Sequence, residues 1–252
     1  MNLYPIIIIG TGMIAVSAAF IVFARQKACP WRYMGLGALV WIVTITIKNF
    51  MAVQLEPVIY GALFTPDKLF APGNILFYIY VGALTGVTEV LLTWLLLRYT
   101  RLGHVPWSKV LAFGIGFGVF EALYLGFSYL ISIITALTNP QSVTEVALAN
   151  LQILSNPLFY MAPIVERVGA ILSHIFCSVL LFYGVASKQA RWLWISFAFK
   201  TLLDAVVGFA FFWGSETALK LWTIEGIVLL FGFVAWLGIR KLQLQYTRLR
   251  HL

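Results

Sequence analysis

Residues 114–126 read GIGFGVFEALYLG and place a glutamate in the middle of a long apolar run. Small residues recur around it at every fourth position, namely Gly114, Gly118, Ala122 and Gly126. This spacing puts them on one helix face, where a neighbouring backbone can approach closely. Because a carboxylate at bilayer depth is costly unless it faces a cavity or a partner, Glu121 is a candidate functional residue in a tightly packed membrane helix.

The same spacing occurs one apolar segment earlier, in GALTGVTE at residues 82–89. Both segments follow the pattern GxxxGxxE, which ends at Glu89 in the first and at Glu121 in the second. Two acids at equivalent places in neighbouring helices predict a paired-carboxylate site. Like charges crowded in a medium of low dielectric favour one group acting as a base beside an acid.

The composition excludes an ordinary soluble protein. Of the 252 residues, 62% are hydrophobic and only 10% are charged, which is typical of a polytopic membrane protein. We therefore expect residues 1–252 to form one transmembrane helical domain. The net charge of +8 lies mostly in loops, so the expected partners are the lipid bilayer and a membrane peptide or membrane protein, with no nucleic acid.

Apolar runs of about 20 residues or more mark spanning helices. The sequence predicts an all-α fold with seven of them, at about 4–24, 33–53, 74–98, 108–137, 157–187, 192–213 and 220–240. Several runs exceed the length that a bilayer needs, which predicts tilt or extension beyond the membrane.

The basic residues predict the orientation. The loops of one side hold most of them: Arg25, Lys27, Arg32, Arg98, Arg101, Lys109, Lys188, Arg191, Arg240, Lys241, Arg248 and Arg250. The loops of the opposite side hold Lys68 and Lys220. Because basic loops stay in the cytoplasm, we expect the N-terminus outside and the C-terminus inside, in a prokaryotic cytoplasmic membrane.

Four ionisable residues on four helices share one depth. Glu89, Glu121, His174 and Asp204 each lie nine to fourteen residues from a basic residue of the charged side. At 1.5 Å per residue this corresponds to a layer about 13–21 Å deep. We therefore predict that these four residues converge and are the catalytic candidates.

Other polar residues are expected to support them. Lys200 lies one helical turn before Asp204, and Ser178 lies one turn after His174. Glu166 and Arg167 are expected farther out on the same helix as His174. The alternative for the Lys200–Asp204 and Arg167 pairs is a structural one, in which buried ion pairs fix the register of the helices.

Four motifs on successive helices resemble those of the YhfC family of intramembrane peptidases, which is related to the CAAX prenyl endopeptidases and the PrsW proteases. They are GALTGVTEV, GIGFGVFEALYLG, VERVGAILSHIFCSVL and FKTLLDA, between about residues 82 and 205. The resemblance implies hydrolysis of a peptide bond inside the bilayer. It implies Glu89 as the base that activates water and His174 as a group that polarises the carbonyl or holds a metal, with Glu121, Glu166, Arg167 and Asp204 in the other motifs.

The chain departs from the family pattern at four positions. Val90 replaces a second glutamate, Thr93 an arginine, and Phe117 and Lys200 two histidines. Zinc is usually held by three protein ligands rich in histidine, so a divalent metal on Glu89, Glu121 and His174 is an open alternative to a metal-free glutamate mechanism, and the cofactor stays unknown.

Two other functions remain open. The four departures favour a catalytically inactive scaffold, or pseudoprotease, of the same fold. Buried acids, a histidine and a lysine also build proton relays, which would suit a proton-coupled membrane carrier, although no inverted repeat of the whole bundle is visible.

Overall fold

The computed structural model describes residues 7–66, 68–139, 141, 144, 156–214 and 217–249. In this part of the chain the long elements are helices: α1 (Ile7–Gln26), α2 (Trp31–Leu63), α3 (Pro72–Thr85), the π-helical turn η2 (Gly86–Leu91), α4 (Leu92–Tyr99), α5 (Trp107–Thr138), α7 (Pro157–Ala186), α8 (Arg191–Trp213) and α9 (Ala218–Leu249). A short 3₁₀ turn, η3, covers Arg101–Gly103. Since α3, η2 and α4 form one span, the described residues contain seven helices that are long and apolar enough to cross a membrane, and this part of the chain is that of a helical integral membrane protein.

Two predicted helix boundaries were wrong. α2 continues past residue 53 to Leu63, and α9 continues past residue 240 to Leu249. Hydropathy falls at Gln54 and along the basic tail, but a helix satisfies its own backbone hydrogen bonds and can extend into water. The predicted start of the first helix, at residues 4–6, lies outside the described residues.

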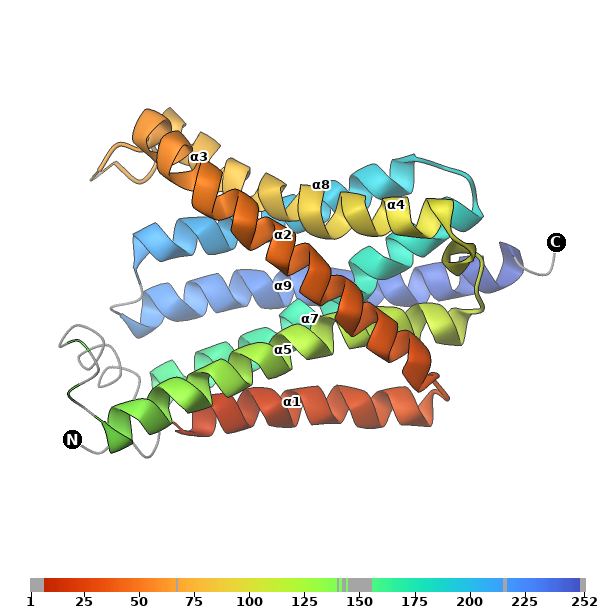
Figure 1. Ribbon diagram of the computed structural model, residues 1–252, viewed down its shortest axis with the longest axis horizontal. Coiled ribbons are helices and arrows are strands. Elements are labelled where there is room, and N and C mark those ends of the chain that lie inside the picture. Colours follow the sequence, from red (N-terminus) through yellow and green to blue (C-terminus); the bar gives the residue numbers. More distant parts are fainter. Residues whose placement is uncertain are drawn as a thin grey trace.

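α7 is the most enclosed of the seven spans, and α5 is second. These two helices pack against each other and form the centre of the bundle. Figure 1 shows α2 running obliquely across α5, with α1 alongside; α8 and α9 pack on α7, and α3 packs on α8. Residues placed on the facing sides of α5 and α7 are therefore the ones shielded best from lipid.

The glycines of α5 allow this helix to pack closely against α7. A Cβ added at Gly114 would lie 2.9 Å from Cα of Ile175, and one added at Gly118 would lie 3.0 Å from Cα of Ile171. Both distances are below ordinary van der Waals contact, so only glycine allows this backbone approach. The close packing predicted from the glycine spacing is confirmed, and it brings Glu121 to the side of His174.

The span that carries Glu89 contains a π-helical turn. In η2 the helix widens over one turn, so the residues after it are rotated relative to α3. Ahead of this turn, Gly82 fixes α3 directly against the backbone carbonyl of Thr201 in α8. Glu89 lies within this turn and points into the bundle, and only 5% of it is exposed. Turns of this kind occur frequently at functional sites.

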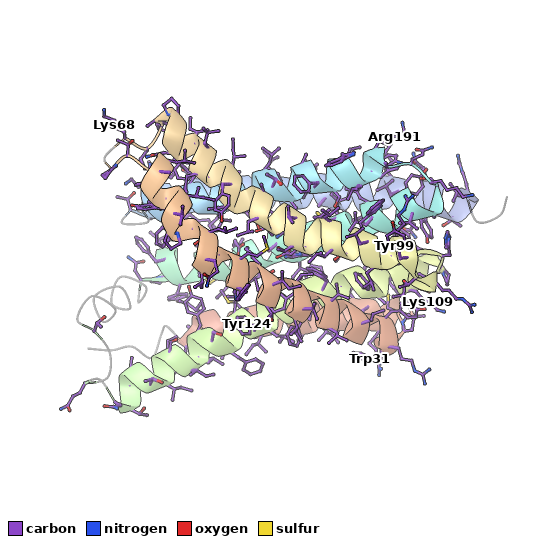
Figure 2. The ribbon with its side chains drawn as sticks, turned by 45° about the horizontal axis from the view of Figure 1, so that its top comes forward. Trp31, Lys68, Tyr99, Lys109, Tyr124 and Arg191 are labelled. Carbon is purple, nitrogen blue, oxygen red and sulfur yellow. The ribbon has the colours of Figure 1, made fainter. Side chains whose placement is uncertain are left out.

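The two ends of the bundle differ in charge. In Figure 2, Lys109 and Arg191 lie at one end together with Trp31 and Tyr99, and Lys68 lies at the other end. This arrangement agrees with the predicted separation of basic loops. Which end faces the cytoplasm remains a prediction.

Candidate functional site

His174 stands between the two predicted glutamates. Its Nε2 lies 2.9 Å from Oε2 of Glu121, and its Nδ1 lies 3.7 Å from Oε2 of Glu89. The three side chains come from α7, α5 and η2, so the contacts join the central helix pair to the π-helical turn. His174 is 4% exposed, which places this carboxylate–histidine–carboxylate row inside the bundle.

Glu121 is held by donors on two further sides. Nε1 of Trp41 in α2 donates a hydrogen bond of 3.0 Å to Oε2, and Nη1 of Arg167 donates one of 2.9 Å to Oε1. Arg167 also contacts its neighbour Glu166 through Nε and Nη2. With His174, both oxygens of Glu121 face donors, so this carboxylate is fixed in place and suited to orienting His174.

Lys200 of α8 joins Glu89 to Asp204. Its Nζ lies 3.3 Å from Oε2 of Glu89 and donates a hydrogen bond of 3.1 Å to Oδ1 of Asp204. The second oxygen of Asp204 lies 3.9 Å from Nζ of Lys48 in α2. Asp204 therefore lies between two ammonium groups and pairs with them rather than with His174.

Glu89 differs from the other carboxylates. Its Oε2 is buried, and although Lys200 and His174 are near, no hydrogen bond reaches it with suitable geometry. The hydroxyl of Thr93, one turn farther along, is also buried without a partner. Both residues line a small cavity of about 10 Å³, which Ser178 lines too. A cavity of this size accommodates about one water molecule, and its polar lining suits one.

A larger cavity is lined in part by the same residues. It has a volume of about 340 Å³ and is lined by side chains of α2, η2, α5, α7 and α8, among them Trp41, Lys48, Tyr124, Arg167 and Leu203. Its size is at the lower end of the range for ligand-binding pockets. Glu89, His174 and Lys200 line both cavities, so the same three side chains border a space for a water and a space for a ligand.

The predicted site residues are thus largely gathered in one place. Glu89, Glu121 and His174 are in contact, and Asp204 reaches them through Lys200 rather than directly. Ser178 lines the small cavity, and Arg167 and Glu166 extend the row beyond Glu121. The catalytic roles assigned to these residues stay predictions.

Trp41 and Lys48 were not foreseen as site residues. They lie seven residues apart on one face of α2, together with Ile45, and all three line the larger cavity. A signal existed in the sequence, since Lys48 is an intramembrane lysine and two helical turns separate it from a tryptophan whose indole N–H needs an acceptor when buried.

A seven-helix bundle with a buried acid–histidine–lysine cluster beside a cavity defines an integral membrane protein with an intramembrane polar centre. The chain belongs to the YhfC intramembrane metalloprotease family, whose model matches residues 12–228. The match extends well beyond the motifs at 82–205. No curated protein and no solved structure shows a significant match.

The metal that the family description implies does not fit the residues of this site. Within the described residues no group of three or more His, Cys, Asp or Glu side chains is arranged to hold a metal ion. Lys200 places a cation 3.3 Å from the Glu89 oxygen that would be a ligand, and the Phe117 ring lies on His174, with ring centroids 5.2 Å apart. Both nitrogens of His174 face carboxylates. The donor set is therefore poor in histidine and already neutralised.

Proposed function

We propose that the protein is an intramembrane peptidase that uses Glu89 as its base and no resident metal. The observation that carries this proposal is the position of Glu89 Oε2. This oxygen is buried and accepts no hydrogen bond, and its side chain lines both a cavity for one water and a cavity for a ligand. A general base must be within reach of the water that it deprotonates, and this position supplies that reach.

Hydrolysis then follows from the groups that line the two cavities. A water held by Glu89, Thr93 and Ser178 attacks the carbonyl carbon of a peptide in the larger cavity, and its proton passes to Glu89. An N–H of Lys200 donates to the carbonyl oxygen as negative charge develops there. The C–N bond breaks, and the leaving nitrogen takes the proton from Glu89, which returns the base to its starting form.

Glu121 acts in this scheme as a positioning residue. Its carboxylate accepts hydrogen bonds from Trp41 and Arg167, which leaves it little capacity to accept a proton from water. Its contact with Nε2 fixes the ring orientation of His174, and the other ring nitrogen faces Glu89. The row thus holds His174 at the wall of the larger cavity.

The substrate class that suits this cavity is an apolar membrane segment with a short unwound stretch. A peptide bond in a regular helix has its backbone groups occupied by internal hydrogen bonds, so a substrate must present extended residues. A volume of about 340 Å³ accommodates only a few residues. We infer a segment from a single-span peptide in a prokaryotic cytoplasmic membrane, with the basic end of the bundle inside.

The test uses proteoliposomes that contain the purified protein and doubly tagged single-span peptides, half of them with a Gly-Pro pair in the span. New peptide ends are identified by mass spectrometry. Cleavage within the span by the wild type, lost in Glu89→Gln and retained in Glu225→Gln, is the expected result. Glu225 is the matched control, because it is also a buried glutamate with an unpartnered oxygen but lines neither cavity. Equal cleavage by wild type and Glu89→Gln would refute the proposal.

A non-catalytic role of the same fold is the second candidate. It is favoured by the pairing of Asp204 with two lysines and of Glu121 with three donors, which resembles a structural network. This candidate predicts no cleavage of any peptide, together with a stable membrane-protein partner on mild solubilisation. Recovery of the protein alone, with cleavage that depends on Glu89, would exclude it.

A further inference from the structure

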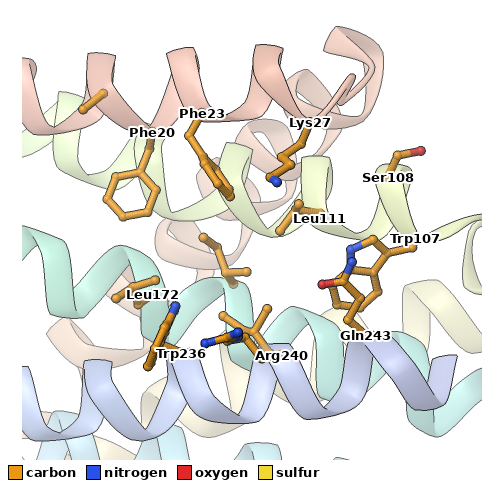
Figure 3. Close-up of a pocket in the computed structure, with 13 residues that line it drawn as sticks. Phe20, Phe23, Lys27, Trp107, Ser108, Leu111, Leu172, Trp236, Arg240 and Gln243 are labelled. Carbon is orange, nitrogen blue, oxygen red and sulfur yellow. The ribbon is translucent and has the colours of Figure 1, made fainter. Parts of the chain in front are cut away.

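A third cavity, larger than the two at the site, lies apart from them, between α1 and α9. Its volume is about 670 Å³, and it shares no lining residue with the cavities around Glu89. Figure 3 shows α1 on one side and α9 on the other, with residues of α5 and α7 between them. α1 packs on α5 and α7, and α9 packs on α7. The cavity therefore lies in a crevice between two outer helices over the central pair.

The inner part of this cavity is apolar. Phe20 and Phe23 of α1 face Leu111, Leu172 and Trp236 across it, as Figure 3 shows. Ile175 and Ile239 complete this part of the lining. Such a surface suits a hydrocarbon chain, since it offers apolar contact along a groove between spanning helices and few polar groups.

One end of the cavity is basic. Lys27 and Arg240 line it from opposite helices, together with Ser108 and Gln243. Lys27 lies 5.7 Å from the ring centroid of Phe23, and Arg240 lies 5.0 Å from that of Trp236. Both cations are thus held against the aromatic walls. The residues that line the cavity include no acidic side chain, so the positive charge at this end is not neutralised within the lining.

We propose that this cavity binds an anionic glycerophospholipid of the membrane. An acyl chain lies along the phenylalanines and Trp236, and the phosphate lies at the end of the cavity that Lys27 and Arg240 line from opposite helices. Basic pockets between spanning helices are suited to acidic lipid head groups, and the volume lies within the range of ligand pockets. The combination of an apolar groove with two cations at one end favours a lipid over a wholly apolar or wholly polar ligand.

The lipid would connect α1 to α9. Because α1 packs on α5 and α7 but lies across the cavity from α9, a bound lipid adds contacts between the two sides of the bundle. Binding to the folded state alone stabilises it. The proposal therefore predicts both retention of the lipid and a higher unfolding temperature when it is bound.

The experiment compares dioleoyl phosphatidylglycerol with dioleoyl phosphatidylcholine, which have the same acyl chains. The purified full-length protein is delipidated, titrated with each lipid in detergent, and examined by native mass spectrometry and thermal unfolding. We expect tighter binding of phosphatidylglycerol, weakened about tenfold or more in Lys27→Gln/Arg240→Gln, since each cation near an anionic lipid contributes on the order of 1 kcal/mol. The thermal shift should weaken in parallel.

The matched control is Arg25→Gln/Lys241→Gln, which removes two positive charges from the same end of the bundle, one in each of α1 and α9, without touching the cavity lining. It should bind phosphatidylglycerol like the wild type. Ala19→Trp, which fills the apolar part, should weaken both lipids. Equal binding of the two lipids by the wild type would overturn the proposal. Equal losses of phosphatidylglycerol binding in the two charge variants would also overturn it. The same holds if the adduct that Ala19→Trp removes is a peptide or a second copy of the protein.

Discussion

At the scale of single residues, Lys200 decides the character of the site. Its ammonium lies between Glu89 and Asp204, where it supplies the positive charge that these carboxylates need inside the membrane. A lysine can also donate a hydrogen bond to a substrate carbonyl, because its ammonium has three donors. One fixed cation can thus balance the acids and polarise the substrate, which are two tasks that a metal performs elsewhere.

Arg167 provides a direct test of the ion pairs. Arg167→Met keeps much of the side-chain volume but leaves Glu121 and Glu166 without their guanidinium partner. Removing one partner of a buried pair costs about 3–5 kcal/mol, so we expect a loss of that order in the free energy of unfolding in detergent. Lys241→Met, at an exposed position of α9, is the control and should change little. Equal stability of the two variants would contradict the assigned pairing.

Cys29 gives a prediction for pH dependence outside the membrane-spanning helices. Burial raises the pKa of the Cys29 thiol above its ordinary value. Because the folded protein keeps the thiol proton to a higher pH than the unfolded chain, this group's contribution to stability is fully present below the ordinary thiol pKa. It is lost as pH rises from that value through the raised pKa of the folded state.

The corresponding measurement is alkylation by a maleimide between pH 7 and pH 9 in a Cys177→Ala background. The Cys29 thiol should react more slowly than an exposed thiol introduced by Lys27→Cys with Cys29→Ala, because less of it is thiolate at each pH. Matching rates across this range would show that burial does not protect it.

The sequence predicted the residues of the site better than their pairing. Glu89, Glu121 and His174 could be placed at one depth because helical rise converts residue counts into distance. It could not show that Asp204 pairs with Lys48, or that Trp41 reaches Glu121. Those contacts depend on the oblique path of α2 across α5, which hydropathy does not encode.

At the scale of helices, α3 and α8 set the distance between Glu89 and Lys200. The close approach is at Gly82, where an added Cβ would meet the carbonyl of Thr201. We expect Gly82→Ala to push α8 away, lower the free energy of unfolding by about 1–3 kcal/mol and reduce peptide cleavage. Thermal unfolding and the cleavage assay measure both effects.

Gly226 in α9 is the matched control. A Cβ there meets nothing within 4 Å, so Gly226→Ala should be neutral, or stabilising by up to about 1 kcal/mol, because alanine favours helix more than glycine does. If Gly82→Ala were equally harmless, the α3–α8 contact would not control the site.

The π-helical turn at η2 was beyond prediction. The spacing of residues that predicts an α-helix does not reveal whether one turn holds an extra residue. GALTGVTE has the spacing of an ordinary α-helix. The turn lies where the span packs in two directions, with Gly82 against α8 before it and Leu97 in the core after it.

At the scale of the whole molecule, composition and run length were enough to predict seven spanning helices, because the bilayer sets both. The extended ends of α2 and α9 were missed, because both helices continue beyond their apolar segments. The orientation in the membrane and the alternative of a proton-coupled carrier stay predictions. A measurement of pH-dependent transport in liposomes would test the carrier.

The whole-molecule prediction for metals concerns zinc. The wild type, dialysed against zinc and desalted, should hold far less than one zinc per chain. Phe117→His with Lys200→His adds two imidazoles beside His174 and Glu89 and removes the competing ammonium, so the variant should hold about one zinc, as a three-histidine site does. Elemental analysis measures the zinc content of each protein. Phe113→His is the control, because Phe113 lies on α5 one turn from Phe117 and lines neither site cavity. One zinc bound by the wild type would contradict the charge balance described above.

The most direct test of metal-free hydrolysis is the cleavage rate of a doubly tagged single-span peptide after metal removal. Wild type and Glu89→Gln are treated with a chelator, reconstituted side by side and assayed with and without added zinc. Metal-free hydrolysis predicts cleavage by the metal-depleted wild type, unchanged by zinc, and none by Glu89→Gln. Cleavage that appears only when zinc is restored, or that survives in Glu89→Gln, would contradict it.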